Sequence, residues 1–318
     1  MIDYIFILIG LAFLYKGADW FVEGASALAK HFGISSLVIG LTVVAFGTSM
    51  PELVVNVFAS IQGNSDVSFG NIVGSNIINL LLILGLTGSI APLIVQKSTV
   101  WKEIPFALLA VLVLATMSNK IMLANGSGNI LTRVDGIILL FFFSIFLYYI
   151  FETIKNGTNG SSDNIKEKSL TKISFMLISG FIFLVLGGKM TVDSAVSIAR
   201  QMGISEFLIS STIVAAGTSL PELVTSIAAA LKKEMDISVG NILGSNIFNI
   251  FFIMGVSAII SPLTVPIGIN VDLIVLAIGT LLFFVFMFTG EKHKFERWEA
   301  LIFLLIYVGY TLFIINRG

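Results

Sequence analysis

The sequence lacks most of the side chains on which soluble enzymes depend. It contains no cysteine, which excludes disulfide bonds, thiolate metal sites and cysteine nucleophiles. It has only two histidines, and charged residues make up 12% of its 318 residues, well below the roughly 25% of an average soluble domain. It has no phosphate-binding loop, Ser-His-Asp set, nucleotide-binding fingerprint or basic patch. We therefore expect no enzyme activity, no cofactor and no nucleic-acid partner.

Long apolar runs dominate what is present. Hydrophobic residues make up 56% of the chain, and its mean hydropathy is +1.00, values that belong to an integral membrane protein surrounded by a lipid bilayer. A membrane-spanning helix needs about 20 mostly apolar residues. On this basis we predict an all-α integral membrane protein with ten transmembrane helices. They are placed at about 3–24, 34–61, 68–92, 101–121, 133–153, 172–193, 204–231, 238–262, 270–289 and 297–316.

The two halves of the chain repeat each other. Adding 170 to a residue number maps Gly10 to Leu93 onto the second half without a gap, and Glu52 then coincides with Glu222. We predict a first five-helix repeat at 1–153 with its repeated motif at about 34–93, a cytoplasmic linker at 154–171, and a second repeat at 172–318 with its motif at about 204–263. Because each repeat has an odd number of spans, the two insert with opposite orientation, an architecture found in secondary transporters.

The distribution of basic residues predicts the orientation in the membrane. Twelve lysines and arginines fall on the side of the linker and four on the opposite side. Cytoplasmic loops carry the excess of positive charge, so the linker should be cytoplasmic. We therefore expect a multi-pass protein of the cell membrane with both termini outside the cell.

A carboxylate lies inside a long apolar run in each half. The segments are Gly47-Thr48-Ser49-Met50-Pro51-Glu52 and Gly217-Thr218-Ser219-Leu220-Pro221-Glu222. A charged residue at membrane depth costs about 2.5–3.5 kcal/mol, so Glu52 and Glu222 are candidate functional residues. The preceding proline breaks the helix and frees backbone carbonyls, which a cation can bind. Carboxylate, hydroxyl and carbonyl oxygens together suit a hard cation such as Na⁺, Ca²⁺ or Mg²⁺.

A second polar segment follows each of these glutamates. It reads Gly70-Asn71-Ile72-Val73-Gly74-Ser75-Asn76-Ile77-Ile78-Asn79 in the first half and Gly240-Asn241-Ile242-Leu243-Gly244-Ser245-Asn246-Ile247-Phe248-Asn249 in the second. Ser75 and Asn79 are four residues apart and share one helix face, as do Thr48 and Glu52. If the two faces meet, their oxygens converge. The simpler interpretation is that such small and polar residues only hold membrane helices together, but packing alone does not require two carboxylates.

These paired segments resemble those of the Na⁺/Ca²⁺ exchanger family of the calcium/cation antiporters, in its prokaryotic form. The resemblance covers the whole predicted layout. It implies that the second, third, seventh and eighth helices form the ion-binding core, and that the first and sixth helices slide to give alternating access.

The resemblance also implies a ligand set. Glu52 and Glu222 correspond to carboxylates that bind calcium and are shared with sodium, and Thr48 and Thr218 would supply oxygens to both ions. The remaining residues correspond to sodium ligands or central polar positions: Ser49, Ser219, Ser75, Ser245, the carbonyls of Ala45 and Ala215, and Asn79 and Asn249. Some relatives carry Asp at one of the two asparagine positions, whereas this chain leaves only two formal negative charges at the centre.

The function that these features favour is secondary antiport of Na⁺ against Ca²⁺, the two ions being its partners. Two alternatives stay open at this point. One is an H⁺/Ca²⁺ or Mg²⁺/Mn²⁺ antiporter that uses the same glutamates, and the other is a cation channel. Ten spans can enclose one complete site, so the layout is compatible with a working monomer.

Overall fold

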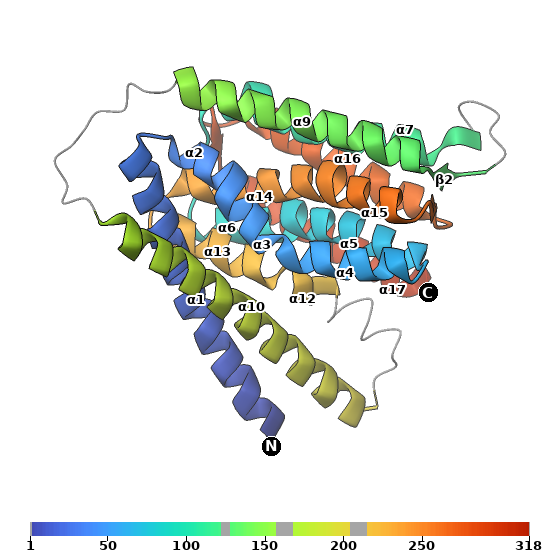
Figure 1. The fold of residues 1–318 in the computed structure, drawn as a ribbon, viewed down its shortest axis with the longest axis horizontal. Coiled ribbons are helices and arrows are strands. Elements are labelled where there is room, and N and C mark those ends of the chain that lie inside the picture. The colour runs from blue at the N-terminus through green and yellow to red at the C-terminus, as the bar shows by residue number, and fades with distance from the viewer. Residues whose placement is uncertain (1, 122–127, 157–167, 204–214, 318) are drawn as a thin grey trace.

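The computed structural model describes residues 2–121, 128–156, 168–203 and 215–317, and these residues are mostly helical (Figure 1). In chain order the helices of the first half are α1 (Ile2–Phe32), α2 (Ser36–Ile39), the π-helical η1 (Gly40–Val44), α3 (Ala45–Thr48), α4 (Met50–Ile61), α5 (Ser65–Ile77), η2 (Ile78–Ile83), α6 (Leu84–Ile90), η3 (Thr99–Glu103), α7 (Ile104–Ser118) and α9 (Arg133–Asn156). Those of the second half are α10 (Leu170–Gln201), α12 (Ala215–Thr218), α13 (Leu220–Leu231), α14 (Met235–Ile247), η5 (Phe248–Ile253), α15 (Met254–Ile260), α16 (Ile269–Phe286) and α17 (Arg297–Arg317).

Eight helical stretches in the described part of the chain are long and apolar enough to cross a membrane. A ninth is the bent pair formed by Ser36–Thr48 and Met50–Ile61, which meet at an angle of 48°. Leu220–Leu231 is a shorter apolar helix, and the first eleven residues of the span predicted at 204–231 lie outside the described residues. Most of the predicted linker at 154–171 also lies outside them.

Two helices are longer than we predicted. The first span was expected to end near residue 24 and the sixth near residue 193, but α1 continues to Phe32 and α10 to Gln201. The prediction stopped where polar residues begin, although a helix keeps its backbone hydrogen bonds after it leaves an apolar environment. At the end of α1 the glycine that follows, Gly33, adopts a left-handed φ of 63°, which is a common way to terminate a helix.

Helices α1 and α10 lie side by side and run obliquely to the other helices (Figure 1). Their backbones approach closely at four glycines. A Cβ atom at Gly17 would lie 2.9 Å from the carbonyl oxygen of Gly180, and one at Gly187 would lie 2.7 Å from that of Gly10. No larger residue fits at such a contact, so the two helices form a tightly joined pair.

The pair is tied to the rest of the protein near the end of α1. Lys232, which follows α13, contacts Asp19 at 2.6 Å and Glu23 at 4.0 Å. Lys168, just before α10, also pairs with Glu23 and so joins the two helices of the pair. The hydroxyl of Ser26 donates to Glu234, just before α14, over 2.6 Å. In the second half of α10, the side chains of Lys189 and Asp193 pair with each other and are 71% and 63% exposed.

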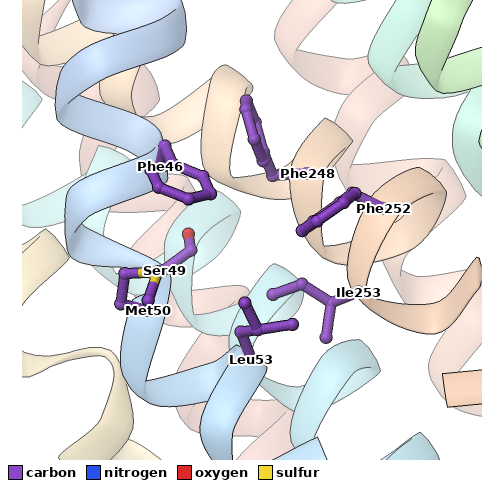
Figure 2. Close-up of a pocket in the computed structure, with 7 residues that line it drawn as sticks. All are labelled: Phe46, Ser49, Met50, Leu53, Phe248, Phe252 and Ile253. Atoms are coloured by element: carbon purple, nitrogen blue, oxygen red, sulfur yellow. The ribbon is translucent and has the colours of Figure 1, made fainter. Parts of the chain in front are cut away.

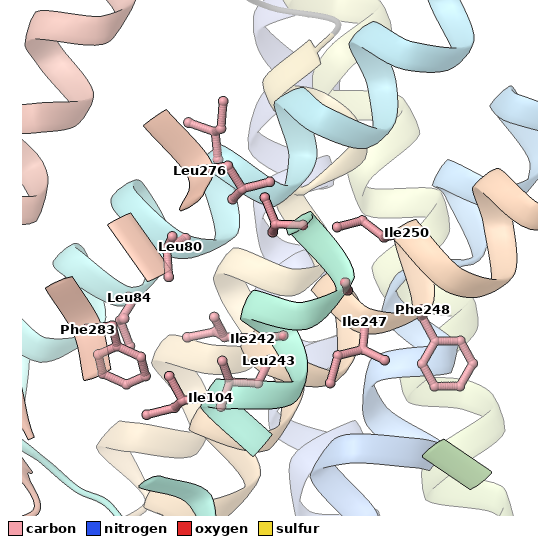
Figure 3. Packing of buried hydrophobic residues seen from close by; sticks show 14 of the residues in the cluster. Leu80, Leu84, Ile104, Ile242, Leu243, Ile247, Phe248, Ile250, Leu276 and Phe283 are labelled. Carbon is pink, nitrogen blue, oxygen red and sulfur yellow. The ribbon is translucent and has the colours of Figure 1, made fainter. Parts of the chain in front are cut away.

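The centre of the protein is formed by α5–η2–α6 and by α14–η5–α15. Within an apolar 18-residue stretch of each, 72% and 83% of the residues are buried, against 17% for α17. Leucine, isoleucine and phenylalanine side chains from these helices and from α7 and α16 pack into one cluster (Figure 3). Because a buried core of this kind is closely packed, it holds the polar groups between the two central helices in fixed positions.

Two short β-bridges join the halves of the chain. The strand β1 (Leu93–Ile94) pairs antiparallel with β4 (Lys294–Phe295), and β2 (Ile130–Leu131) pairs in the same way with β3 (Leu263–Thr264). The 170-residue shift maps β1 onto β3, so these are equivalent strands of the two halves. Each of them pairs with a strand of the opposite half. The sequence did not predict these bridges, because two-residue strands have no periodic pattern.

Candidate ion-binding site

The helix breaks at the two Pro-Glu segments are confirmed. In the first half α3 ends at Thr48, Ser49 leaves the helical conformation with ψ at 7°, and α4 begins at Met50 with the proline in its first turn. The second half repeats this with Ser219 at ψ 6° and α13 beginning at Leu220. Proline fits in the first turn of a helix because backbone N–H groups there have no carbonyl partner within the helix, so its missing N–H costs nothing. Each glutamate consequently lies in the first turn of a new helix, where the helix dipole favours a negative charge.

The two glutamates are brought together by serines of the opposite half. Ser219 donates a hydrogen bond to Oε1 of Glu52 over 3.3 Å, and Ser49 donates one to Oε1 of Glu222 over 3.0 Å. Ser75 of α5 also donates to Glu52 over 3.3 Å. Both glutamate side chains are completely buried. The predicted convergence of hydroxyl and carboxylate oxygens from the two halves is therefore present in the structure.

The two threonines are held by asparagines from the other half. The hydroxyl of Thr48 lies 2.9 Å from Oδ1 of Asn241, and that of Thr218 lies 3.4 Å from Oδ1 of Asn71. Thr48 is also within reach of the carbonyls of Val44 and Ala45, at 3.1 and 3.3 Å. Sequence reasoning did not assign a role to Asn71 or Asn241, although each occupies the same place in the repeated segment.

The central asparagines lie on π-helical turns. Asn79 is the second residue of η2, and Asn249 is the second residue of η5. Their side-chain amides donate across the interface, Asn79 to Oδ1 of Asn246 over 3.1 Å and Asn249 to Oδ1 of Asn76 over 2.9 Å. Short π-helical turns occur frequently at functional sites, since they rotate a side chain away from the regular helical position. The sequence did not predict them.

Five buried oxygens of the predicted ligand residues have no hydrogen-bond partner among the described residues. They are Oε2 of Glu52, Oε2 of Glu222, Oδ1 of Asn79, Oδ1 of Asn249 and Oγ of Ser245. A buried polar atom without a partner costs about 1–3 kcal/mol, so such a cluster requires an explanation. All five are oxygens, and two belong to carboxylates. This donor set fits a hard cation such as Ca²⁺ or Na⁺ better than a metal that prefers nitrogen or sulfur.

The two alanine carbonyls occupy matching places at the helix breaks. The carbonyl of Ala45 accepts the backbone N–H of Ser49 over 3.0 Å and lies 3.3 Å from the hydroxyl of Thr48. Ala215 is the first residue of α12.

An apolar pocket lies beside Ser49. It is lined by Phe46, Met50 and Leu53 from the first half and by Phe248, Phe252 and Ile253 from the second (Figure 2). Ser49 contributes the polar side chain in this lining, and its hydroxyl is the one that donates to Glu222. The pocket therefore leaves one side of the site covered by aromatic and aliphatic groups, which keeps the local dielectric low.

A family model for sodium/calcium exchanger proteins matches residues 2–152 and 172–316. The chain belongs to the sodium/calcium exchanger family. It is 37% identical over 315 residues to the putative antiporter CaxA of Alkalimonas amylolytica, covering 96% of each chain. The sodium/calcium exchanger MaX1 of Methanosarcina acetivorans is 33% identical, with 98% of each chain covered.

A solved structure of the sodium-calcium exchanger NCX_Mj has a similar fold. Its TM-score to this chain is 0.83 with 36% sequence identity, and the match covers 98% of both chains. The resemblance noted from the two repeated segments is thus confirmed at the level of the family. This exchanger-family chain is a multi-pass membrane protein, and the relatives named above are exchangers and antiporters, not enzymes.

Proposed function

We propose that this chain exchanges Na⁺ for Ca²⁺ across the membrane, with Glu52 and Glu222 as the charges that both ions share. One observation carries the proposal. The two buried carboxylates are linked across the halves by serine hydrogen bonds, and each keeps one oxygen without a partner among the described residues. The relatives that match nearly the whole chain include proteins named as sodium/calcium exchangers, which supports the choice of ions.

The charge of the site accounts for coupling between the two ions. Two carboxylates neutralise one Ca²⁺ or two Na⁺. Without cations, two negative charges in a low-dielectric site repel each other strongly. The empty site then disfavours the conformational change that switches its opening from one side of the membrane to the other. Binding of either set of ions permits that change. Opposite fluxes become coupled without any chemical step, and sodium entering down its gradient drives calcium out.

Each predicted ligand has a place in this scheme. Glu52, Glu222, Thr48 and Thr218 serve both ions. The sodium ions also use four serine hydroxyls and two backbone carbonyls, and the central amides complete the site. These ligands are Ser49, Ser75, Ser219, Ser245, the carbonyls of Ala45 and Ala215, and Asn79 and Asn249. Serine hydroxyls favour sodium over protons as counter-ion, because a proton needs no cage of oxygens.

The architecture that we propose for exchange is two inverted five-helix repeats, at 1–153 and 172–318, joined by a cytoplasmic linker. The hydrogen bonds from Ser49 and Ser219 support it, because the 170-residue shift interchanges them. The excess of basic residues on the linker side supports a cytoplasmic linker and outer termini. An impermeant thiol reagent should then label a cysteine introduced at Asn316 in intact cells, whereas labelling only after lysis would reverse the orientation.

The moving part in this scheme is the α1–α10 pair. None of the predicted ligands lies on these two helices, and their close contact makes them one unit. The contacts of Asp19, Glu23 and Ser26 hold the second half of α1 against residues that follow α13. We propose alternating access in which the pair slides along the ion-binding core, so that these contacts break when the other side of the site opens.

Uptake of radioactive calcium into proteoliposomes tests the function. Vesicles containing the purified protein are loaded with sodium and diluted into sodium-free buffer, and matched vesicles carry a proton gradient or no gradient at the same membrane potential. We expect calcium uptake only with internal sodium. Uptake driven by the proton gradient alone would favour the H⁺/Ca²⁺ alternative. Flux without any counter-ion would indicate a channel and contradict exchange.

A further inference from the structure

Four asparagines are joined by hydrogen bonds between the two central helices. Asn76 donates from Nδ2 to the backbone carbonyl of Asn246 over 3.1 Å, and Asn246 donates from Nδ2 to the backbone carbonyl of Asn76 over 3.3 Å. Each also accepts, through Oδ1, the amide N–H of Asn249 or Asn79. All four side chains are buried.

The backbone carbonyls determine which way every amide in this network points. A backbone carbonyl only accepts hydrogen bonds, so the Asn246 atom that faces the carbonyl of Asn76 must be the nitrogen. The other atom of the Asn246 amide is then the oxygen, and the Asn79 atom that faces it must be a donor. Oδ1 of Asn79 is left on the opposite side, where it has no partner among the described residues. The same reasoning through Asn76 orients Asn249.

We infer that Asn76 and Asn246 are positioning residues, which hold the amides of Asn249 and Asn79 with their oxygens toward the bound cation. This inference rests on the proposed function, since it assumes that a cation occupies the site. An unrestrained amide can rotate by half a turn and present its NH₂ group instead. That group would repel a cation and could donate to the free carboxylate oxygens in its place. Asn76 and Asn246 prevent this rotation without touching the ion.

A second pair of contacts follows the same rule. Asn241 directs Nδ2 to the backbone carbonyl of Glu222 at 3.4 Å and to the hydroxyl of Ser226 at 2.9 Å, so its Oδ1 accepts from Thr48. The Thr48 hydroxyl has one proton, and Oδ1 of Asn241 at 2.9 Å is closer to it than the carbonyls of Val44 and Ala45 at 3.1 and 3.3 Å. With the proton directed to Asn241, the lone pairs of the hydroxyl oxygen remain for a cation. Asparagines that are not themselves ligands thus orient both a hydroxyl and an amide of the site.

A double-mutant cycle separates positioning from simple helix packing. Asn246→Leu is made in the wild type and in Asn79→Ala, and equilibrium binding of radioactive calcium to the purified protein is measured together with the unfolding temperature. We expect Asn246→Leu to weaken calcium binding about 10- to 100-fold in the wild type, as loss of a ligand-orienting partner does. In Asn79→Ala the same change should weaken it by no more than about two-fold, because no amide is left to orient.

The opposite result would overturn the inference. Equal weakening in both backgrounds, or no weakening in the wild type, would mean that Asn246 does not act through Asn79. The mirror cycle, Asn76→Leu with Asn249→Ala, makes the same prediction and decides the question if Asn246→Leu does not fold. The packing control is Asn119→Leu, which removes a reciprocal 2.8 Å amide pair between Asn119, directly after α7, and Asn270 of α16. It should lower the unfolding temperature and leave calcium binding unchanged.

Glu52→Gln distinguishes failure of this inference from failure of the proposed site. If Glu52→Gln leaves calcium binding unchanged, the ion site itself is wrong. If Glu52→Gln abolishes binding and Asn246→Leu does not affect it, the site stands and the positioning role is wrong.

Discussion

Replacing either Glu52 or Glu222 by glutamine should abolish exchange while the protein still inserts and folds. Glutamine keeps Oε1, which accepts the serine hydrogen bonds, and loses the negative charge. Removing a carboxylate that pairs with a buried cation costs about 3–5 kcal/mol, or about two to four orders of magnitude in affinity. A site with one carboxylate cannot neutralise Ca²⁺. Calcium uptake into sodium-loaded proteoliposomes measures the effect.

Glu103→Gln is the matched control for this prediction. Glu103 is also completely buried in a membrane-spanning helix, but its carboxylate accepts the hydroxyl of Tyr149 and makes no hydrogen bond to a predicted ligand among the described residues. Glutamine can still accept that hydrogen bond. Exchange at a near-normal rate is expected for Glu103→Gln. Exchange at the wild-type rate in Glu52→Gln or Glu222→Gln would show that the two carboxylates do not carry the ions.

Gly187→Ala should destabilise the α1–α10 pair and slow exchange. Its new Cβ would lie 2.7 Å from the carbonyl oxygen of Gly10 and from the backbone nitrogen of Leu14, and backbone atoms cannot move aside as a flexible side chain can. Overpacking of this kind lowers the free energy of unfolding by about 1–3 kcal/mol. This loss outweighs the gain of about 0.5–1 kcal/mol that alanine brings over glycine in a helix interior. Thermal unfolding and the initial rate of exchange report the two effects.

The neighbouring glycine supplies the control. A Cβ at Gly188 would meet Pro221 at 3.9 Å, an ordinary contact, so Gly188→Ala should be neutral or slightly stabilising. Because α1 and α10 contribute none of the predicted ligands, Gly187→Ala should still bind calcium at equilibrium. The proposed division between a mobile pair and an ion-binding core would be contradicted if binding were lost together with transport.

The part of the site that the sequence predicted is the part encoded by residue type and spacing. Glu52 and Glu222 stand out because a carboxylate in an apolar run is costly, and the repeat identifies their threonine and serine neighbours. The structure brings these side chains together across the two halves, as expected. The break between α3 and α4 was predictable for the same local reason, since proline removes a helical hydrogen bond.

Other features depend on packing between distant segments and left no local signal. The π-helical turns at Asn79 and Asn249 arise where two central helices meet, and their sequences are ordinary apolar helix sequences. The roles of Asn76 and Asn246 follow from hydrogen bonds between residues 167 to 173 positions apart. Spacing alone placed Asn76 beside Ser75 and Asn246 beside Ser245, and could not tell a ligand from a residue that orients one.

Competition between sodium and calcium at equilibrium tests the central claim most directly. Binding of radioactive calcium to the purified protein is measured at increasing sodium concentration, with potassium replacing sodium to keep the ionic strength constant. If the ions share Glu52 and Glu222, sodium should raise the half-saturating calcium concentration steadily without reducing the number of sites, and potassium should not. Calcium binding that does not respond to sodium would mean that the two ions bind at separate sites, and would contradict the proposed exchange.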